Sequence, residues 1–164
     1  MSQAFNLRSA LGLASWFGIT FLAAAVGAVA SIQAKGFYMK LIRPWWAPPS
    51  ELFGPVWTVL YVLMGVAAWM IWERYGFSAG RVALVAFVLQ LALNSFWTWV
   101  FFRFQLGAAS FVEILLLWGV VLWTVIAFMR LRPLAGLLLT PYLAWTTFAT
   151  ILTWAIWRRN PDLL

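Results

Sequence analysis

The sequence predicts an all-α membrane protein, a bundle of five transmembrane helices with a folded, lid-like first loop. Of the 164 residues, 65% are hydrophobic. Only 9% are charged, against about a quarter in a soluble domain, so polar surface is too scarce to cover a globule in water. Five apolar segments are each long enough to cross a bilayer, which takes about 20 residues.

The predicted spans are bounded by charged residues, proline or glycine and lie at residues 10–34, 51–72, 82–102, 107–129 and 134–157. The first also resembles a secretory signal, because Arg8 precedes it and the residues from Ala28 to Ser31 are small. Its apolar stretch is too long for a signal core, so we interpret it as a permanent span. Apart from residues 35–50 the connections are short, which predicts antiparallel neighbours within a single domain over residues 1–164.

The basic residues divide almost evenly between the two sides of the membrane. The side of the first loop and the C-terminus holds Lys35, Lys40, Arg43, Arg103, Arg158 and Arg159, and the other holds Arg8, Arg74, Arg81, Arg130 and Arg132. Six against five predicts a cytoplasmic C-terminus by the positive-inside rule. The short segment before the first span has no Arg- and Ser-rich transit peptide, which favours a bacterial inner membrane.

The composition also narrows the chemistry. Cysteine and histidine are absent, which excludes disulfides, thiolate chemistry and the usual zinc and haem ligands, so no metal site is expected. Four carboxylates leave little material for a conventional hydrolase. The net charge of +7 comes from basic residues that sit singly at span ends, so we expect membrane lipids as partners and no nucleic acid.

Two amides lie near the middle of the third span. Gln90 and Asn94 are one helical turn apart, and Trp97 and Phe101 continue the same face of the helix. Polar groups at this depth face protein or water, because lipid cannot satisfy them. Asn94 is expected either to form an interhelical hydrogen bond or to face a ligand cavity, and the two roles can coexist.

Two aromatic stripes accompany the amides. The 13 tryptophans can belong to a belt at the membrane interface or to the wall of an aromatic cavity, and the depth of each tryptophan in its span distinguishes the two. Trp57 lies about two turns into its span, deeper than a belt requires. The stripes are Trp57, Tyr61 and Met64 in the second span and Trp145, Ala149 and Leu152 in the fifth. Pro141 is expected to loosen or kink the fifth helix before the second stripe.

Glu113 is the one carboxylate clearly inside an apolar run. An ionisable group at such a position is a functional candidate by default. With no second titratable group near it in sequence, we favour a structural role in which it is neutral, hydrogen-bonded or stabilised by the helix N-terminus.

A face of small residues recurs every four positions in the first span, at Ala23, Gly27 and Ser31. Such a face lets a second helix approach closely. The second helix can belong to the same bundle or to another copy of the chain, so the face predicts either internal helix packing or a homodimer.

The first loop is unusually apolar. Phe37, Tyr38, Leu41 and Ile42 have the spacing of one apolar helical face. Three prolines then stiffen the approach to the second span. We expect this loop to fold back over the end of the bundle as a lid, with an interfacial segment lying on lipid as the alternative.

Several motifs recur together in a known family. They are Arg43-Pro-Trp-Trp-Ala-Pro-Pro49, the run from Val56 to Gly65, Ala92-Leu-Asn94 with Trp97 and Phe101-Phe102, Pro141-Tyr-Leu-Ala-Trp145 with Ala149-Thr150, and Ile156-Trp-Arg158 with Asn160. Together they resemble the tryptophan-rich sensory protein/translocator protein family, also called peripheral-type benzodiazepine receptors. The resemblance covers nearly the whole chain, from about Gly36 to Asn160, with the motifs in the order of the spans.

The resemblance implies five helices around a cavity closed by the first loop, often in a homodimer. It implies binding of porphyrins such as protoporphyrin IX and of synthetic benzodiazepine-type compounds. Because the chain has no histidine or cysteine to ligate iron, we expect metal-free porphyrin or weakly held haem and no required cofactor. The ligand-binding residues it implies are Tyr38, Pro44, Trp46, Trp57, Tyr61, Asn94, Trp97, Trp145, Ala149 and Leu152. The basic residues Lys40 and Arg43 are expected near the porphyrin carboxylates.

The chain departs from the family pattern at three places. Relatives that bind cholesterol have a tyrosine between the equivalents of Leu152 and Arg158, and Trp154 stands there instead, so cholesterol is not expected as a partner. Phe37 replaces a tryptophan of some members, and Trp97 replaces a phenylalanine of others.

Three functions follow in order of preference. The first is a tetrapyrrole-binding sensor or carrier in the membrane. The second is light- and oxygen-dependent degradation of porphyrin, in which Trp57 is the candidate catalytic residue and acts only photochemically. The third is transport of porphyrin or lipid, although no paired broken helices of the usual transporter kind occur in the sequence.

Overall fold

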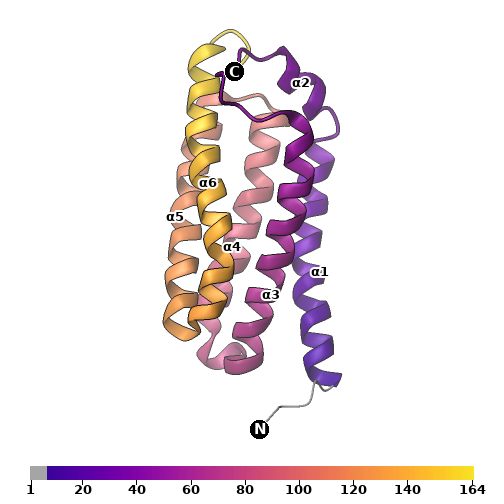
Figure 1. The fold of residues 1–164 in the computed structure, drawn as a ribbon, viewed down its shortest axis with the longest axis vertical. Helices are drawn as coiled ribbons and strands as arrows, with labels where there is room; N and C mark the ends of the chain where they lie inside the picture. Colours follow the sequence, from indigo (N-terminus) through magenta and orange to yellow (C-terminus); the bar gives the residue numbers. More distant parts are fainter. Residues whose placement is uncertain (1–6) are drawn as a thin grey trace.

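The computed structural model describes residues 7–164 and is an antiparallel bundle of long helices (Figure 1). Within this part of the chain, five helical segments are long and apolar enough to cross a membrane, as the sequence predicts. Their helices are α1 (Leu7–Ala30), α3 (Phe53–Ala79), α4 (Arg81–Thr98), α5 (Gly107–Leu131) and α6 (Pro133–Arg159). The short helix α2 (Ala34–Lys40) and the 3₁₀ turn η1 (Ser50–Leu52) belong to the first loop, and the π-helical turn η2 (Trp99–Arg103) extends α4.

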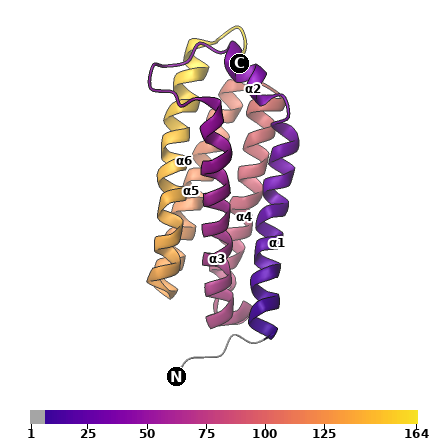
Figure 2. The same cartoon turned by 45° about the vertical axis from the view of Figure 1, so that its right-hand side comes forward.

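Helices α3 and α4 each pack against three others: α4 against α1, α3 and α5, and α3 against α1, α4 and α6, while α6 also packs against α5. The turned view shows α1 at one side and α6 at the other (Figure 2). Phe87 of α4, Met64 of α3 and Phe128 of α5 are fully buried in the main core. Many other apolar side chains point outward, as expected where lipid replaces water as the solvent. The short connections place the end of each long helix beside the start of the next one.

The ends of two spans differ from the prediction. The first helix ends at Ala30 rather than near residue 34, because a turn at residues 31–33 separates it from α2. The second helix continues past residue 72 to Ala79. Near its end Gly76 has a φ of 60°, a left-handed conformation that glycine adopts without steric cost, and the chain turns there toward α4.

Pro141 leaves α6 continuous instead of breaking it. Proline has no N–H to donate to Leu137, the residue four positions earlier. The carbonyl of Leu137 instead accepts a hydrogen bond of 2.8 Å from the hydroxyl of Thr140. A neighbouring side chain therefore satisfies the carbonyl that the proline leaves free, and the helix runs on to the aromatic stripe.

Candidate functional site

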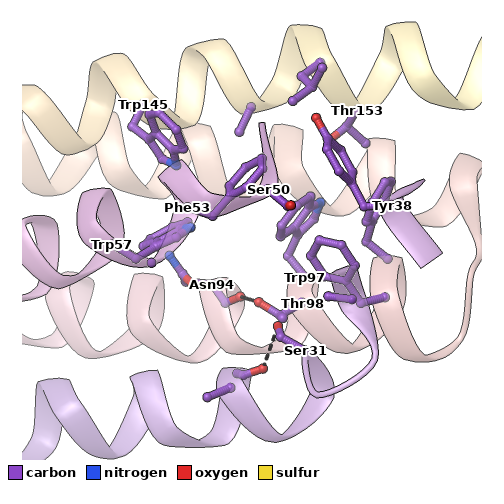
Figure 3. A pocket seen from close by; sticks show the side chains of 18 of the residues that line it. Ser31, Tyr38, Ser50, Phe53, Trp57, Asn94, Trp97, Thr98, Trp145 and Thr153 are labelled. Atoms are coloured by element: carbon purple, nitrogen blue, oxygen red, sulfur yellow. Dashed lines mark hydrogen bonds between the residues drawn. The ribbon is translucent and has the colours of Figure 1, made fainter. Parts of the chain in front are cut away.

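A cavity of about 440 Å³ lies at the end of the bundle that carries α2 and the C-terminus. This volume falls within the range of small-molecule sites. Eight of the residues predicted to bind a ligand line it, namely Tyr38, Trp57, Tyr61, Asn94, Trp97, Trp145, Ala149 and Leu152. Figure 3 shows side chains from α2, α3, α4 and α6 converging on the same space.

Aromatic rings form the wall of the cavity. The ring centroids of Trp57 and Trp145, on α3 and α6, are 6.5 Å apart and the rings are nearly perpendicular. Trp57 also lies 5.5 Å from Tyr61, and Trp97 stacks on Phe101 at 5.3 Å. Edge-to-face and offset contacts of this kind stabilise aromatic clusters beyond the area they bury. The rings thus form a rigid apolar surface that suits a flat aromatic ligand.

Asn94 has both of the roles that its position in the sequence suggests. Its side-chain oxygen accepts a hydrogen bond of 3.2 Å from the Tyr61 hydroxyl, and its amide nitrogen donates one of 2.9 Å to the Tyr142 hydroxyl. Asn94 is 3% exposed and also lines the cavity. The amide therefore joins α3, α4 and α6 at the cavity floor and holds Tyr61 in place as part of the wall.

Trp97 carries an unsatisfied donor in this site. Its indole nitrogen Nε1 is buried and has no hydrogen-bond partner among residues 7–164. A buried donor without a partner costs free energy, on the order of 1–3 kcal/mol. Trp97 lines the cavity, but Nε1 itself is not exposed to it, so this donor is unpaired in the wall and not at its surface.

The π-helical turn η2 shapes the same wall, and the sequence did not predict it. The N–H of Phe104 donates to the carbonyl of Trp99, five residues earlier, at 2.9 Å. Phe101 and Phe102 both lie within this turn, and both line the cavity. Such turns occur frequently at functional sites.

The first loop folds over this end of the bundle, as the lid interpretation predicts. Tyr38 and Leu41 are buried against Phe101, Leu152 and Ile156. The Tyr38 hydroxyl donates to the carbonyl of Pro48 at 3.0 Å. Burial raises the pKa of Tyr38, and a hydrogen bond and the charge of Arg43 oppose this shift. The phenol therefore stays protonated and able to donate at neutral pH.

One predicted lid residue faces outward. Ile42, which the helical spacing placed on the buried face, is 65% exposed. Helix α2 ends at Lys40 and Leu41 is extended, so successive side chains point to opposite sides from there. Leu41 consequently points into the bundle and Ile42 away from it.

Asn160 holds the lid to the end of α6. Its side-chain oxygen accepts a hydrogen bond of 2.8 Å from the N–H of Ile42. Its amide nitrogen donates to the carbonyls of Ile42 at 3.1 Å and Ile156 at 2.7 Å. Asn160 is 3% exposed and thus forms a buried clamp between segments 118 residues apart.

A salt bridge joins the start of α2 to η1 at the exposed edge of the cavity lining. Lys35 and Glu51 line the cavity and form this bridge at 2.9 Å. Both side chains are more than half exposed, so the pair contributes little to stability. Its position matters more, because it connects the two segments at this edge of the cavity.

The small-residue face of α1 lies inside the bundle. Gly27 and Ser31 line the cavity, and the carbonyl of Ala23 accepts a hydrogen bond of 2.8 Å from Ser95 of α4. A side chain at Gly27 would contact Thr98 of α4 at 3.5 Å. The structure therefore uses this face for internal packing.

Two residues that the resemblance placed in the ligand site, Pro44 and Trp46, do not line the cavity. Pro44 is buried within the lid, and Trp46 packs edge-on against Phe148 at 5.8 Å. Trp46 thereby supports Phe148, which does line the cavity. Their contribution to the site is through the lid and the second layer of rings.

Glu113 lies on α5 and is 6% exposed. Neither of its carboxylate oxygens has a hydrogen-bond partner among the described residues, so the expected hydrogen-bonded arrangement is not seen. Glu113 does not line the cavity. Gln90, also buried, donates weakly to the sulfur of Met64 at 3.7 Å.

Five membrane-spanning helices around a lidded cavity with aromatic walls define an integral membrane protein of the helix-bundle class. Comparison with known proteins gives the family. The chain matches the model of the TspO/MBR family over residues 16–158 and belongs to that family.

Three relatives illustrate the similarity. The chain is 40% identical to the tryptophan-rich protein TspO of Chlorobaculum tepidum over 78% of this chain and 82% of the relative. It is 39% identical to the tryptophan-rich sensory protein of Cereibacter sphaeroides over 87% and 90% of the two chains. It is also 38% identical to the human translocator protein over 76% and 75%.

Proposed function

We propose that the protein binds a protoporphyrin IX-like tetrapyrrole in the aromatic cavity and acts as a sensor or carrier for it. The observation that carries the proposal is a cavity walled by Trp57, Trp97 and Trp145 and covered by a folded lid. A porphyrin is flat, largely apolar and aromatic, so indole faces stack on it favourably. The same cavity suits flat synthetic ligands of the benzodiazepine type.

The polar groups at the site fit the edges of such a ligand. We propose that the Trp97 ring turns on binding, so that its buried and unpaired N–H donates to an acceptor such as a carboxylate or ring nitrogen. Arg43 lies over the Tyr38 ring at 4.8 Å, and Lys40 is exposed at the end of α2, so both are available near the lid for a propionate. Since the sequence has no histidine or cysteine, the proposed ligand is metal-free porphyrin in preference to haem.

Trp97→Phe tests this binding mode. The variant keeps an aromatic ring but removes the N–H, so we expect the affinity for protoporphyrin IX to fall about fivefold, or ~1 kcal/mol. The measurement is saturable quenching of tryptophan fluorescence in the dark, with empty detergent as the blank. Trp45→Phe is the matched control, because Trp45 is 95% exposed and does not line the cavity. An unchanged affinity in Trp97→Phe would refute the hydrogen bond, and equal uptake by empty detergent would refute the site.

Photochemical degradation of the bound porphyrin is the second candidate function. It is favoured by the connected rings of Trp57, Tyr61 and Trp145, which offer oxidisable side chains beside a photosensitiser. Molecular oxygen is the oxidant in this reaction, and no acid–base pair is needed. Trp57 is the proposed participant because it contacts both other rings.

Trp57→Phe is expected to slow the loss of pigment under light and oxygen to near the rate in protein-free detergent. Trp118→Phe should leave the rate of pigment loss unchanged, because Trp118 is hydrogen-bonded to Thr147 and does not line the cavity. The decay of the porphyrin absorption band measures both. Bleaching that persists in Trp57→Phe would remove Trp57 from the reaction, and binding without pigment loss in the unmodified protein would exclude this function.

The remaining proposals concern the membrane, the partners and transport. We propose that the protein lies in a bacterial inner membrane with its C-terminus in the cytoplasm. A reporter enzyme fused to the C-terminus, active on only one side of the membrane, tests this orientation.

We propose a homodimer that uses a face other than Ala23, Gly27 and Ser31, since those residues pack internally. The molecular mass of the detergent-solubilised protein tests this. Transport of porphyrin or lipid is the third function, and uptake into proteoliposomes would separate it from binding alone.

A further inference from the structure

A second groove lies at the opposite end of the bundle from the cavity, between the start of α1 and the end of α3. Arg8, Gly12, Ser15 and Ile19 follow one another at helical spacing and line it from α1. Trp72 of α3 borders the groove from the other side. The small residues at its centre and the large ones around it give a channel along α1 that faces the lipid.

The close approach of the two helices forms the base of the groove. A side chain at Gly12 would overlap the Trp72 ring, so only glycine allows α3 to come this near. Apolar side chains that border the groove are exposed, including Leu11 at 59% and Phe77 at 64%. The groove is therefore apolar, open and rigid at its floor.

Charge fixes the kind of molecule that fits. The Arg8 guanidinium lies over the Trp72 ring at 5.6 Å and forms no salt bridge within residues 7–164. The surroundings are strongly basic. The charged residues of this end are Arg8, Arg74, Arg81, Arg130 and Arg132, with Glu73 as the acid. Glu73 accepts a hydrogen bond of 2.7 Å from Ser9.

The length of the groove fits a lipid chain. From Arg8 to Ile19 the helix rises about 16 Å, at 1.5 Å per residue. One leaflet of the hydrocarbon core is ~15 Å thick, half of about 30 Å. A phosphate on Arg8 at the membrane surface thus places an acyl chain along the groove over the depth of one leaflet.

We propose that this groove binds an anionic phospholipid of the surrounding membrane, with its phosphate on Arg8 and one acyl chain along Gly12, Ser15 and Ile19. Arginine pairs with phosphate through two parallel hydrogen bonds. A zwitterionic headgroup also carries a cation, which the basic surface repels, so a headgroup with net negative charge binds more favourably. The site is separate from the aromatic cavity, so it acts as a structural lipid site or a point at which membrane composition affects the bundle.

Native mass spectrometry of the full chain in neutral detergent tests the proposal, with phosphatidylglycerol and phosphatidylcholine of matched acyl chains as probes. We expect the unmodified protein to retain phosphatidylglycerol about fivefold better than phosphatidylcholine, and Arg8→Gln to lose that preference. Ser15→Trp fills the groove and should lower retention of both lipids. Its thermal unfolding, followed in parallel, verifies that it folds.

Arg130→Gln is the matched control, because Arg130 is exposed at the same end and does not line the groove. Its lipid retention should equal that of the unmodified protein. An equal loss in Arg130→Gln would show general attraction to a basic surface and overturn the site. Retention that is unchanged in Arg8→Gln, or equal for the two lipids, would overturn it as well. If the unmodified protein forms a dimer without bound lipid and Ser15→Trp abolishes that dimer, the groove would belong to a second copy of the chain instead.

Discussion

Asn160→Ala is expected to increase the dissociation rate constant of a cavity ligand about tenfold, with a smaller change in the association rate constant. The substitution removes the two hydrogen bonds by which the side chain holds Ile42 of the first loop, and a third to Ile156 at the end of α6 itself. Each such bond contributes ~0.5–1.5 kcal/mol net, and 1.4 kcal/mol corresponds to a factor of ten. Because the lid covers the cavity, its open population limits how fast a ligand leaves.

Asn160→Asp tests the two hydrogen bonds that this side chain donates. The carboxylate keeps the acceptor for the Ile42 N–H but loses both donors to the carbonyls of Ile42 and Ile156. The second carboxylate oxygen then faces two carbonyl oxygens in a buried site and repels them, so the dissociation rate constant should be at least as high as in Asn160→Ala. Stopped-flow displacement of bound protoporphyrin IX by a competing ligand measures all three proteins. Equal dissociation rates would show that the lid is held by its apolar contacts, with Tyr38 and Leu41 sufficient.

The sequence was enough to predict the spans and much of the cavity wall. Lipid exposure leaves long apolar runs that composition detects directly, and short loops fix neighbouring helices as antiparallel. Asn94 and Trp57 stood out because each lies deeper in its span than a lipid-facing or interfacial role explains, and Trp145 because it begins a stripe at helical spacing. The aromatic stripes then fell on the inward faces, as the structure confirms.

The features that were missed depend on pairings between distant segments or on backbone geometry. Asn160 is hydrogen-bonded to Ile42, and no sequence pattern around either residue indicates the other as its partner. The π turn that carries Phe101 and Phe102 is a local change in helix pitch, which hydrophobic periodicity does not report. Gly27 looked equally suited to a dimer and to the bundle, because a small residue permits close packing whatever the partner.

Asn94→Leu is expected to lower the free energy of unfolding by about 1–3 kcal/mol. Leucine has a similar size but cannot pair with the hydroxyls of Tyr61 and Tyr142, which then remain buried without this partner. Hydrogen bonds between membrane helices are worth ~0.6 kcal/mol on average and up to about 1.7, and each orphaned hydroxyl adds a desolvation cost. With ~2–4 °C lost per kcal/mol, the melting temperature of the detergent-solubilised protein should fall by several degrees.

The double variant Asn94→Leu/Tyr142→Phe distinguishes this mechanism from a loss of packing. If the cost comes from an unpaired hydroxyl, removing that hydroxyl should restore part of the stability, so the two substitutions will not be additive. Tyr142→Phe alone should destabilise, because it leaves the Asn94 amide without its acceptor. Additive losses in the melting temperature would instead mean that Asn94 contributes by shape. A non-additive result would show that the amide at the cavity floor holds α3, α4 and α6 together through its hydrogen bonds.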